Sequence, residues 1–441
     1  MKLLLRCLVF SLAPLVTFSA TAANFAATNI VVERVSIGTA PATSAATPVY
    51  VDEYLPATAN QSAPVQSVSL PDATPRPTAS PFNLMDSGSA TSDGQLTRSA
   101  DGTGLNLAGY NAISGDLSIV NSGGATNRVI GFINAAGVID TSRNLVAFTN
   151  GNNFRSVVSV NGSAFWCGGP TNDTSVANLS GGIIYYTNGT AVKLASNDIR
   201  YLGIFGGQLF FSTQTAPIGI YALGSGLPTS PAAASLVIPL VGGTPSPVAF
   251  QFNPATNVCY VADSRGSKGG VFKFTYNGTA WVSNYLFGTS LLPNGANGLA
   301  VNWSGANPVL YITTQGGTNL IAINDTNAAA TATILAKTDG STNIFRGVAL
   351  APVTAPAIII TSSSYNPASQ QFTLTWSSTA GASYSVLYST NLSLAGGGFS
   401  PLVTDIYAGG LTANATVTVP AGPVGFVRIV SLPPAAQSAK E

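Results

Sequence analysis

The stretch Pro247-Val-Ala-Phe-Gln-Phe-Asn-Pro-Ala-Thr-Asn-Val-Cys-Tyr-Val-Ala-Asp263 decides the fold. An alternating apolar run meets a polar turn, and a second run then ends in a small residue and Asp263. Two further strand-like runs follow, Gly269–Tyr276 and Ala280–Leu286, joined by the hairpin turn Asn277-Gly278. Four antiparallel strands in about 50 residues are the size of one β-propeller blade.

Degenerate copies of the first strand recur along the chain, starting near residues 95, 155, 200, 247, 297 and 346. The last copy, 346–352, has no second strand after it, whereas three N-terminal strands at 30–35, 48–54 and 65–70 lack a first strand. Joining them completes a sixth blade, pairs the two ends of the chain and removes open sheet edges. The sequence therefore predicts an all-β chain with a six-bladed β-propeller over 24–353. A seven-bladed ring and a sandwich array or solenoid are the alternatives.

A second, smaller β-domain is expected after the propeller. Short apolar runs separated by Ser, Gly, Asn and Pro are typical of a small β-sandwich. These runs are Ala357–Thr361, Gln371–Trp376, Tyr384–Tyr388, Phe399–Val403, Ala415–Val419 and Gly425–Val430. We expect a sandwich over 354–432 with Trp376 between its sheets, followed by a tail at 433–441.

The N-terminus has the features of a secretory signal over residues 1–23. Lys2 and Arg6 are followed by the apolar stretch Leu8–Phe18 and by the small residues Ala20-Thr21-Ala22. We expect a secreted, extracellular protein, with the periplasm or the cell surface as alternatives; the competing interpretation of this segment is a buried N-terminal strand. No later apolar run approaches a transmembrane length, so no membrane span is expected in the mature chain.

Composition excludes several classes of function. Charged residues make up 7% of the chain, against a usual figure of roughly 25%, and the net charge is +1 with no basic block. Nucleic-acid binding, which needs clustered Lys and Arg, is therefore not expected. Cleavage of the signal leaves two cysteines, Cys167 and Cys259, which the repeat register places two blades apart. We expect both to be free, buried thiols because they lie too far apart to bridge.

Two resemblances support this architecture. The segment 247–276, with its Pro…Tyr-Val-Ala-Asp pattern, resembles the repeats of NHL-type six-bladed secreted propellers. The region 24–353 is similar in layout to exported bacterial propellers that lack an assigned activity. Within 371–392, Phe-Thr-Leu-Thr-Trp and Tyr-Ser-Thr-Asn-Leu resemble fibronectin type III-like modules of bacterial secreted proteins. The resemblances imply a propeller followed by an immunoglobulin- or fibronectin-like sandwich, and they name no ligand.

Catalytic motifs are missing from the sequence. The chain contains no histidine, which excludes Ser-His-Asp and Cys-His catalysis and His-ligated metals. It also contains no Ser-x-x-Lys and no Gly-Lys-Ser/Thr triplet of a phosphate loop. We therefore predict no catalytic residue, no metal ligand and no cofactor.

The candidate ligand site is the ring of residues at the starts of the first strands, which we expect at one mouth of the channel. These residues are Gln95, Arg155, Arg200, Pro247, Asn297 and Arg346. Three converging guanidinium groups would bind a carboxylate, phosphate or sulfate. The alternative is that each arginine packs between blades and hydrogen-bonds to carbonyl groups.

Three classes of function follow from this pattern. We favour a non-catalytic extracellular binding or scaffold protein whose ligand is a glycan, an acidic small molecule or a protein. The second class is a metal-dependent hydrolase of the lactonase type, which uses a six-bladed propeller; the ring contains no carboxylate, and Asp198 lies two residues from it. The third is a structural surface or matrix protein.

Overall fold

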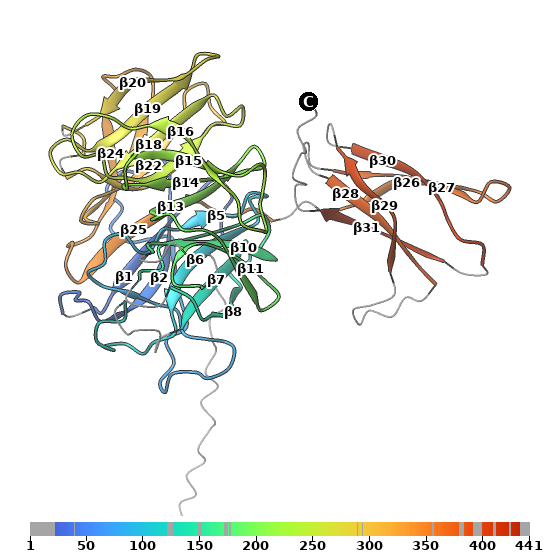
Figure 1. The fold of residues 1–441 in the computed structure, drawn as a ribbon, viewed down its shortest axis with the longest axis horizontal. Coiled ribbons are helices and arrows are strands. Elements are labelled where there is room, and N and C mark those ends of the chain that lie inside the picture. Colours follow the sequence, from blue (N-terminus) through green and yellow to red (C-terminus); the bar gives the residue numbers. More distant parts are fainter. Residues whose placement is uncertain are drawn as a thin grey trace, which may run out of the picture.

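The computed structural model describes residues 23–38, 40–120, 127–148, 152–171, 175, 178–288, 290–292, 294–354, 357–378, 383–390, 399–408, 412–422 and 425–432. The predicted signal at 1–22 and the tail at 433–441 lie outside these ranges. Strands are the only long regular elements in the described part, and none of its segments is a helix able to cross a membrane. The strands before residue 351 and those after residue 359 form two separate bodies (Figure 1).

Four blades are regular four-stranded antiparallel sheets. The first consists of β9 (Ser156–Ser159), β10 (Ala164–Gly169), β11 (Gly182–Thr187) and β12 (Thr190–Ala195). The second consists of β13 (Tyr201–Phe205), β14 (Gln208–Thr213), β15 (Gly219–Leu223) and β16 (Ala234–Pro239). The third consists of β17 (Pro247–Phe252), β18 (Val258–Asp263), β19 (Gly270–Tyr276) and β20 (Trp281–Phe287). The fourth consists of β21 (Ala296–Asn302), β22 (Val309–Thr314), β23 (Asn319–Asn324) and β24 (Ala332–Lys337).

The two remaining blades complete the ring. One consists of β5 (Thr97–Arg98), β6 (Gly104–Tyr110), β7 (Arg128–Asn134) and β8 (Ile139–Leu145). The other consists of β25 (Asn343–Leu350), β1 (Ile30–Ser36), β2 (Ala46–Tyr54) and β3 (Gln66–Ser69). The first strand of each blade, here called the inner strand, contacts the inner strands of both neighbours in the order β5, β9, β13, β17, β21, β25 and back to β5. The chain therefore folds as the predicted six-bladed propeller.

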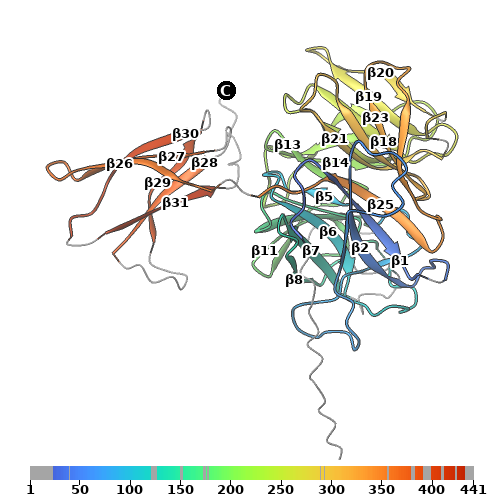
Figure 2. The ribbon, with the colours of Figure 1, turned by 180° about the vertical axis from the view of Figure 1, so that it is seen from behind.

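The two ends of the propeller segment meet in one blade. Ile30 lies opposite Leu350 and Val35 opposite Ile344 in the antiparallel pair of β1 with β25. The two strands run side by side when the molecule is seen from behind (Figure 2). This pairing confirms that 346–352 supplies the strand missing before 30–35.

The structure differs from the prediction at the next blade. The expected first strand over 95–102 is only two residues long, because the backbone NH groups of Gln95, Ala100 and Asp101 donate to carbonyls of the β9 blade instead. An unpredicted strand, β4 (Met85–Ser87), pairs with the start of β2 and with Tyr110. The start of β2 extends beyond β1 and β3, and β4 supplies hydrogen-bond partners for its backbone.

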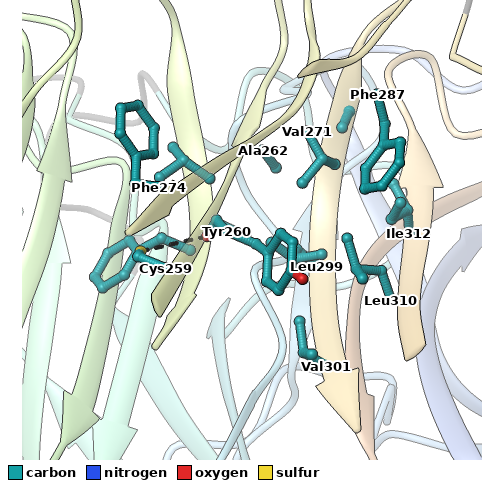
Figure 3. Packing of buried hydrophobic residues seen from close by; sticks show 14 of the residues in the cluster. Cys259, Tyr260, Ala262, Val271, Phe274, Phe287, Leu299, Val301, Leu310 and Ile312 are labelled. Atoms are coloured by element: carbon teal, nitrogen blue, oxygen red, sulfur yellow. Dashed lines mark hydrogen bonds between the residues drawn. The ribbon is translucent and has the colours of Figure 1, made fainter. Parts of the chain in front are cut away.

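The propeller core lies between the faces of neighbouring blades. Figure 3 shows one such cluster, in which Tyr260 of β18 lies beside Leu299 of β21 and Leu310 of β22, whereas Cys259 of β18 and Phe274 of β19 lie on the other face of the same blade. These side chains alternate along each strand, which is why period-two patterning located the blades. Cys167 and Cys259 are buried free thiols in the β9 and β17 blades, which confirms the expectation.

The C-terminal strands form two three-stranded antiparallel sheets. One has the order β26 (Ile360–Asn366), β27 (Gln371–Ser377), β30 (Thr412–Thr418), and the other β29 (Ser400–Tyr407), β28 (Ser383–Ser389), β31 (Phe426–Leu432). Trp376 is fully buried in a core with residues of both sheets, against Tyr384 at 5.7 Å between ring centroids. The strand predicted at 357–361 was placed too early. Ile359 and Ile360 are exposed, and the pairing with β27 instead continues through the polar residues to Asn366.

Candidate binding site in the central channel

The six inner strands enclose a cavity of about 370 Å³. Every inner strand contributes to its wall, and one residue from each is Arg98, Val158, Tyr201, Gln251, Ala300 and Val348. The cavity is therefore part of the central channel. Its lining comes mainly from the middle and the carboxyl ends of the inner strands, away from the predicted arginine ring.

The cavity wall is mixed, with aromatic and aliphatic side chains beside polar groups. Phe205, Phe252 and Trp303 supply aromatic rings. The Nε2 atom of Gln251 donates hydrogen bonds to the Tyr201 hydroxyl and to the Leu299 carbonyl, both at 3.2 Å. The Nε atom of Arg98 donates to the Gly102 carbonyl at 3.1 Å, and burial lowers the pKa of its guanidinium. The wall thus presents one cationic group beside aromatic and aliphatic surface.

A hydrogen bond between Gln95 and Asn297 crosses the channel on the strand-start side of this cavity. The Nε2 atom of Gln95 donates to Oδ1 of Asn297 at 3.2 Å, and both side chains are buried. Gln95 lies two residues before β5 and Asn297 is the second residue of β21, and these two strands are separated in the ring by β25. Gly347 of β25 permits the close approach: a Cβ atom there would lie 2.1 Å from the Leu96 nitrogen.

Arg346, one of the three predicted ring arginines, is 1% exposed. Its Nη2 atom donates to the carbonyls of Gly88 at 2.7 Å and Ser87 at 3.2 Å. It lies across from Glu33 at an irregularity in the pairing of β1 with β25. These contacts are those of the alternative interpretation, an arginine bonded to carbonyls between blades.

Arg155 and Arg200 lie close enough to interact. The Nη1 atom of Arg155 forms a 2.6 Å ion pair with Asp198 and donates to the Ile199 carbonyl at 2.9 Å. Arg200 donates to the Gln214 side chain at 2.6 Å, and no salt bridge to it is found in the described part of the chain. Burial, together with repulsion from Arg155, lowers the pKa of Arg200 to about 10. Of the three arginines, Arg155 has an ion pair and Arg346 bonds only to carbonyls, whereas Arg200 has no ion pair in the described residues and is acted on by the more distant Asp198, Asp93 and Asp263.

Three buried carboxyl groups near the arginines were missed by sequence reasoning: Glu33, Asp86 and Asp93. Asp93 accepts hydrogen bonds from the Tyr110 hydroxyl and from Asn153 Nδ2, each at 2.8 Å. The repeat register could have located it, because Asp93 precedes Gln95 by two positions as Asp198 precedes Arg200. Asp86 lies in the unpredicted β4 and carried no such signal.

Burial changes the protonation of this cluster. It raises the pKa of Glu33 to about 8, with Arg346 opposing the shift and Asp93 adding to it. It also raises the pKa of Asp86 well above its usual range, reinforced by Asp93 and Glu33. At neutral pH, Glu33 is therefore largely protonated, and its two oxygens have no hydrogen-bond partner in the structure. Among the described residues, no group of three or more Asp, Glu or Cys side chains is arranged to hold a metal ion.

Comparisons with known proteins find propeller folds and no family. No family model matches the chain, and no curated protein matches it. Among solved structures, a candidate 6-phosphogluconolactonase from Bacteroides uniformis is 12% identical with a TM-score of 0.41, covering 88% of this chain and 99% of its own. TolB from Acinetobacter baumannii is 9% identical with a TM-score of 0.41, covering 74% and 67%. A gluconolactonase from Xanthomonas campestris is 12% identical with a TM-score of 0.35, covering 76% and 94%. The likenesses carry no functional argument, and the fold assignment rests on the strand pairing.

Proposed function

We propose that the chain is a non-catalytic binding protein that uses the propeller as a platform and holds a small ligand in the central channel. The observation that carries this proposal is the cavity of about 370 Å³ to which all six inner strands contribute. A cavity of this size, lined by aromatic rings and convergent polar groups, can hold a small molecule.

The lining favours a ligand with an apolar body and one anionic group. Phe205, Phe252 and Trp303 would cover the apolar body. Arg98 would pair with the anionic group, since a guanidinium group in a partly buried site forms strong, charge-assisted hydrogen bonds. Gln251, already bonded to Tyr201, adds a carbonyl oxygen that can accept a hydrogen bond.

A series of straight-chain carboxylates from butanoate to decanoate tests the proposal by isothermal titration calorimetry on the mature chain. We expect binding that strengthens with chain length and that falls about tenfold, or about 1.4 kcal/mol, in Arg98→Met. Arg143→Met is the matched control, because Arg143 pairs with Asp140 and does not line the cavity. Absence of binding across the series, or equal loss in both variants, would reject this ligand class.

The second candidate is a metal-dependent hydrolase of the lactonase type. The buried carboxyl groups of Glu33, Asp86 and Asp93 are the ones such an activity would have to use, and in the described residues they do not form a metal-binding group. Hydrolysis of glucono-δ-lactone that requires Ca²⁺, stops with a chelator and is lost in Asp93→Asn would replace the binding proposal. We expect no such turnover.

Export is part of the proposal and rests on the signal-like segment at 1–23. N-terminal sequencing of protein recovered outside the cytoplasm should begin at Ala23 or Asn24. An intact Met1 on exported protein would contradict cleavage.

A further inference from the structure

The C-terminal domain has a groove of about 220 Å³ at one end of its two sheets. Three aromatic rings line it: Tyr365 of β26, Phe372 of β27 and Tyr388 of β28. Val419 and Val427 complete its apolar wall. Phe372, Val419 and Val427 also pack against the core around Trp376, so the groove lies at the edge of that core. Tyr365 and Tyr388 line the groove and do not belong to the core cluster.

The rings are held in place and yet open to solvent. Tyr365 and Phe372 meet edge to face with centroids 6.4 Å apart, and Tyr365 is 52% exposed. Tyr388 packs against Gly425, where a Cβ atom would lie 2.5 Å from the ring. An aromatic surface of this kind can stack on a flat apolar face of a ligand while the hydroxyls of Tyr365 and Tyr388 accept or donate hydrogen bonds.

The surroundings of the groove are nearly free of charge. Asp405 and Arg428 are the only charged residues in the sequence from 354 to 432. The polar side chains that line the groove are the tyrosines Tyr365 and Tyr388. Such a surface offers no complement to a strongly charged partner, whereas tyrosine hydroxyls beside aromatic rings suit a neutral, polyhydroxylated one.

We propose that this groove binds a neutral glycan. Sugar rings carry an apolar C–H face for stacking on Tyr365, Phe372 and Tyr388, and their hydroxyl groups can hydrogen-bond to the hydroxyls of Tyr365 and Tyr388. The volume of about 220 Å³ holds one or two sugar residues of a chain that continues into solvent. This site is independent of the propeller cavity, and either can fail without the other.

Native affinity electrophoresis of the mature chain in gels containing laminarin, galactomannan, xylan or hydroxyethylcellulose tests the proposal. We expect at least one polysaccharide to retard the protein. Tyr365→Ala and Tyr388→Ala should each weaken this retardation about tenfold, and Tyr365→Phe should retain most of it because the ring remains.

Tyr276→Ala is the control, since Tyr276 is an exposed aromatic residue on β19 of the propeller. It should leave the retardation unchanged. Thermal unfolding of Tyr365→Ala checks that the exposed substitution leaves the fold intact. The proposal is overturned if none of the four polysaccharides retards the wild-type chain. Equal retardation of the wild type and both alanine variants overturns it as well.

Discussion

The two ends of the central channel are built from the same six strands and are nevertheless opposite in character. At the strand starts, Arg346, Glu33 and the Gln95–Asn297 pair are buried and fill the space. Toward the strand ends, aromatic and aliphatic side chains leave a cavity of about 370 Å³. The polar end ties β25 to the segment 87–94, the joint at which the ring closes. We infer that one end of the channel serves closure and the other is free for a ligand.

The largest expected effect tests the closure role of Arg346. Arg346→Met leaves the buried carbonyls of Ser87 and Gly88 without their charged hydrogen-bond donor. We expect the free energy of unfolding in urea to fall by about 3–5 kcal/mol, because each of two buried acceptors loses a hydrogen bond to a charged group. Arg98→Met at the cavity end should lower it by less than about 1 kcal/mol. Similar losses in the two variants would remove the contrast between the ends.

The next effect is a dependence of stability on pH. Burial raises the pKa of Glu33 from 4.5 to about 8, and the groups that act on it are Arg346, Asp93 and Asp86. The folded state therefore keeps a proton that the unfolded state releases. This stabilisation is fully present below about pH 4.5 and is lost as the pH rises through 8.

We expect the free energy of unfolding to fall by on the order of 4 kcal/mol between pH 5 and pH 8.5. Glu33→Gln, which stays neutral, should flatten this slope when denaturation is measured across the same range. A slope that is unchanged in the variant would assign the dependence to Asp86 or Asp93.

A smaller effect is expected at the bridge across the channel. Gln95→Ala and Asn297→Ala should each lower the free energy of unfolding by about 1–2 kcal/mol, because each leaves a buried amide without its partner. The double variant should lose less than the sum, since both substitutions break one hydrogen bond. Carboxylate binding in the cavity should not change. Strictly additive losses would indicate that the 3.2 Å contact contributes no coupling energy.

The smallest effect concerns Arg200, which is the arginine of the predicted anion site whose side chain has neither an ion pair nor a backbone carbonyl partner in the described residues. Arg200→Ala should cost less than about 1 kcal/mol because its hydrogen bond to Gln214 is exposed. If an anion binds there, sulfate should raise the Tm of the wild type above that in chloride at equal ionic strength, and the variant should lose this difference. The same sulfate effect in both proteins would leave the arginine ring with a purely structural role.

Sequence reasoning located the blades more reliably than the site. Alternating runs and the Asn277-Gly278 turn marked the β17 blade, and the unmatched strand at 346–352 revealed the closure with β1. Sequence reasoning did not locate β4, which pairs with the start of β2 where β2 extends beyond β1 and β3. It named Arg155, Arg200 and Arg346 as equivalents, whereas each has a different partner in the structure. The anion site at these residues stays a prediction.

The sequence by itself determined most of the strands and the repeat that favours six blades. These properties follow from period-two alternation and turn chemistry, which are local. Only the tertiary structure decided that Gln95 meets Asn297, 202 positions away, and that Glu33 lies across from Arg346. The repeat register assigns a residue to the start of an inner strand but not to a partner on another strand. Ring closure and the close backbone approach at Gly347 select those partners, and they thereby leave one end of the channel filled and the other open.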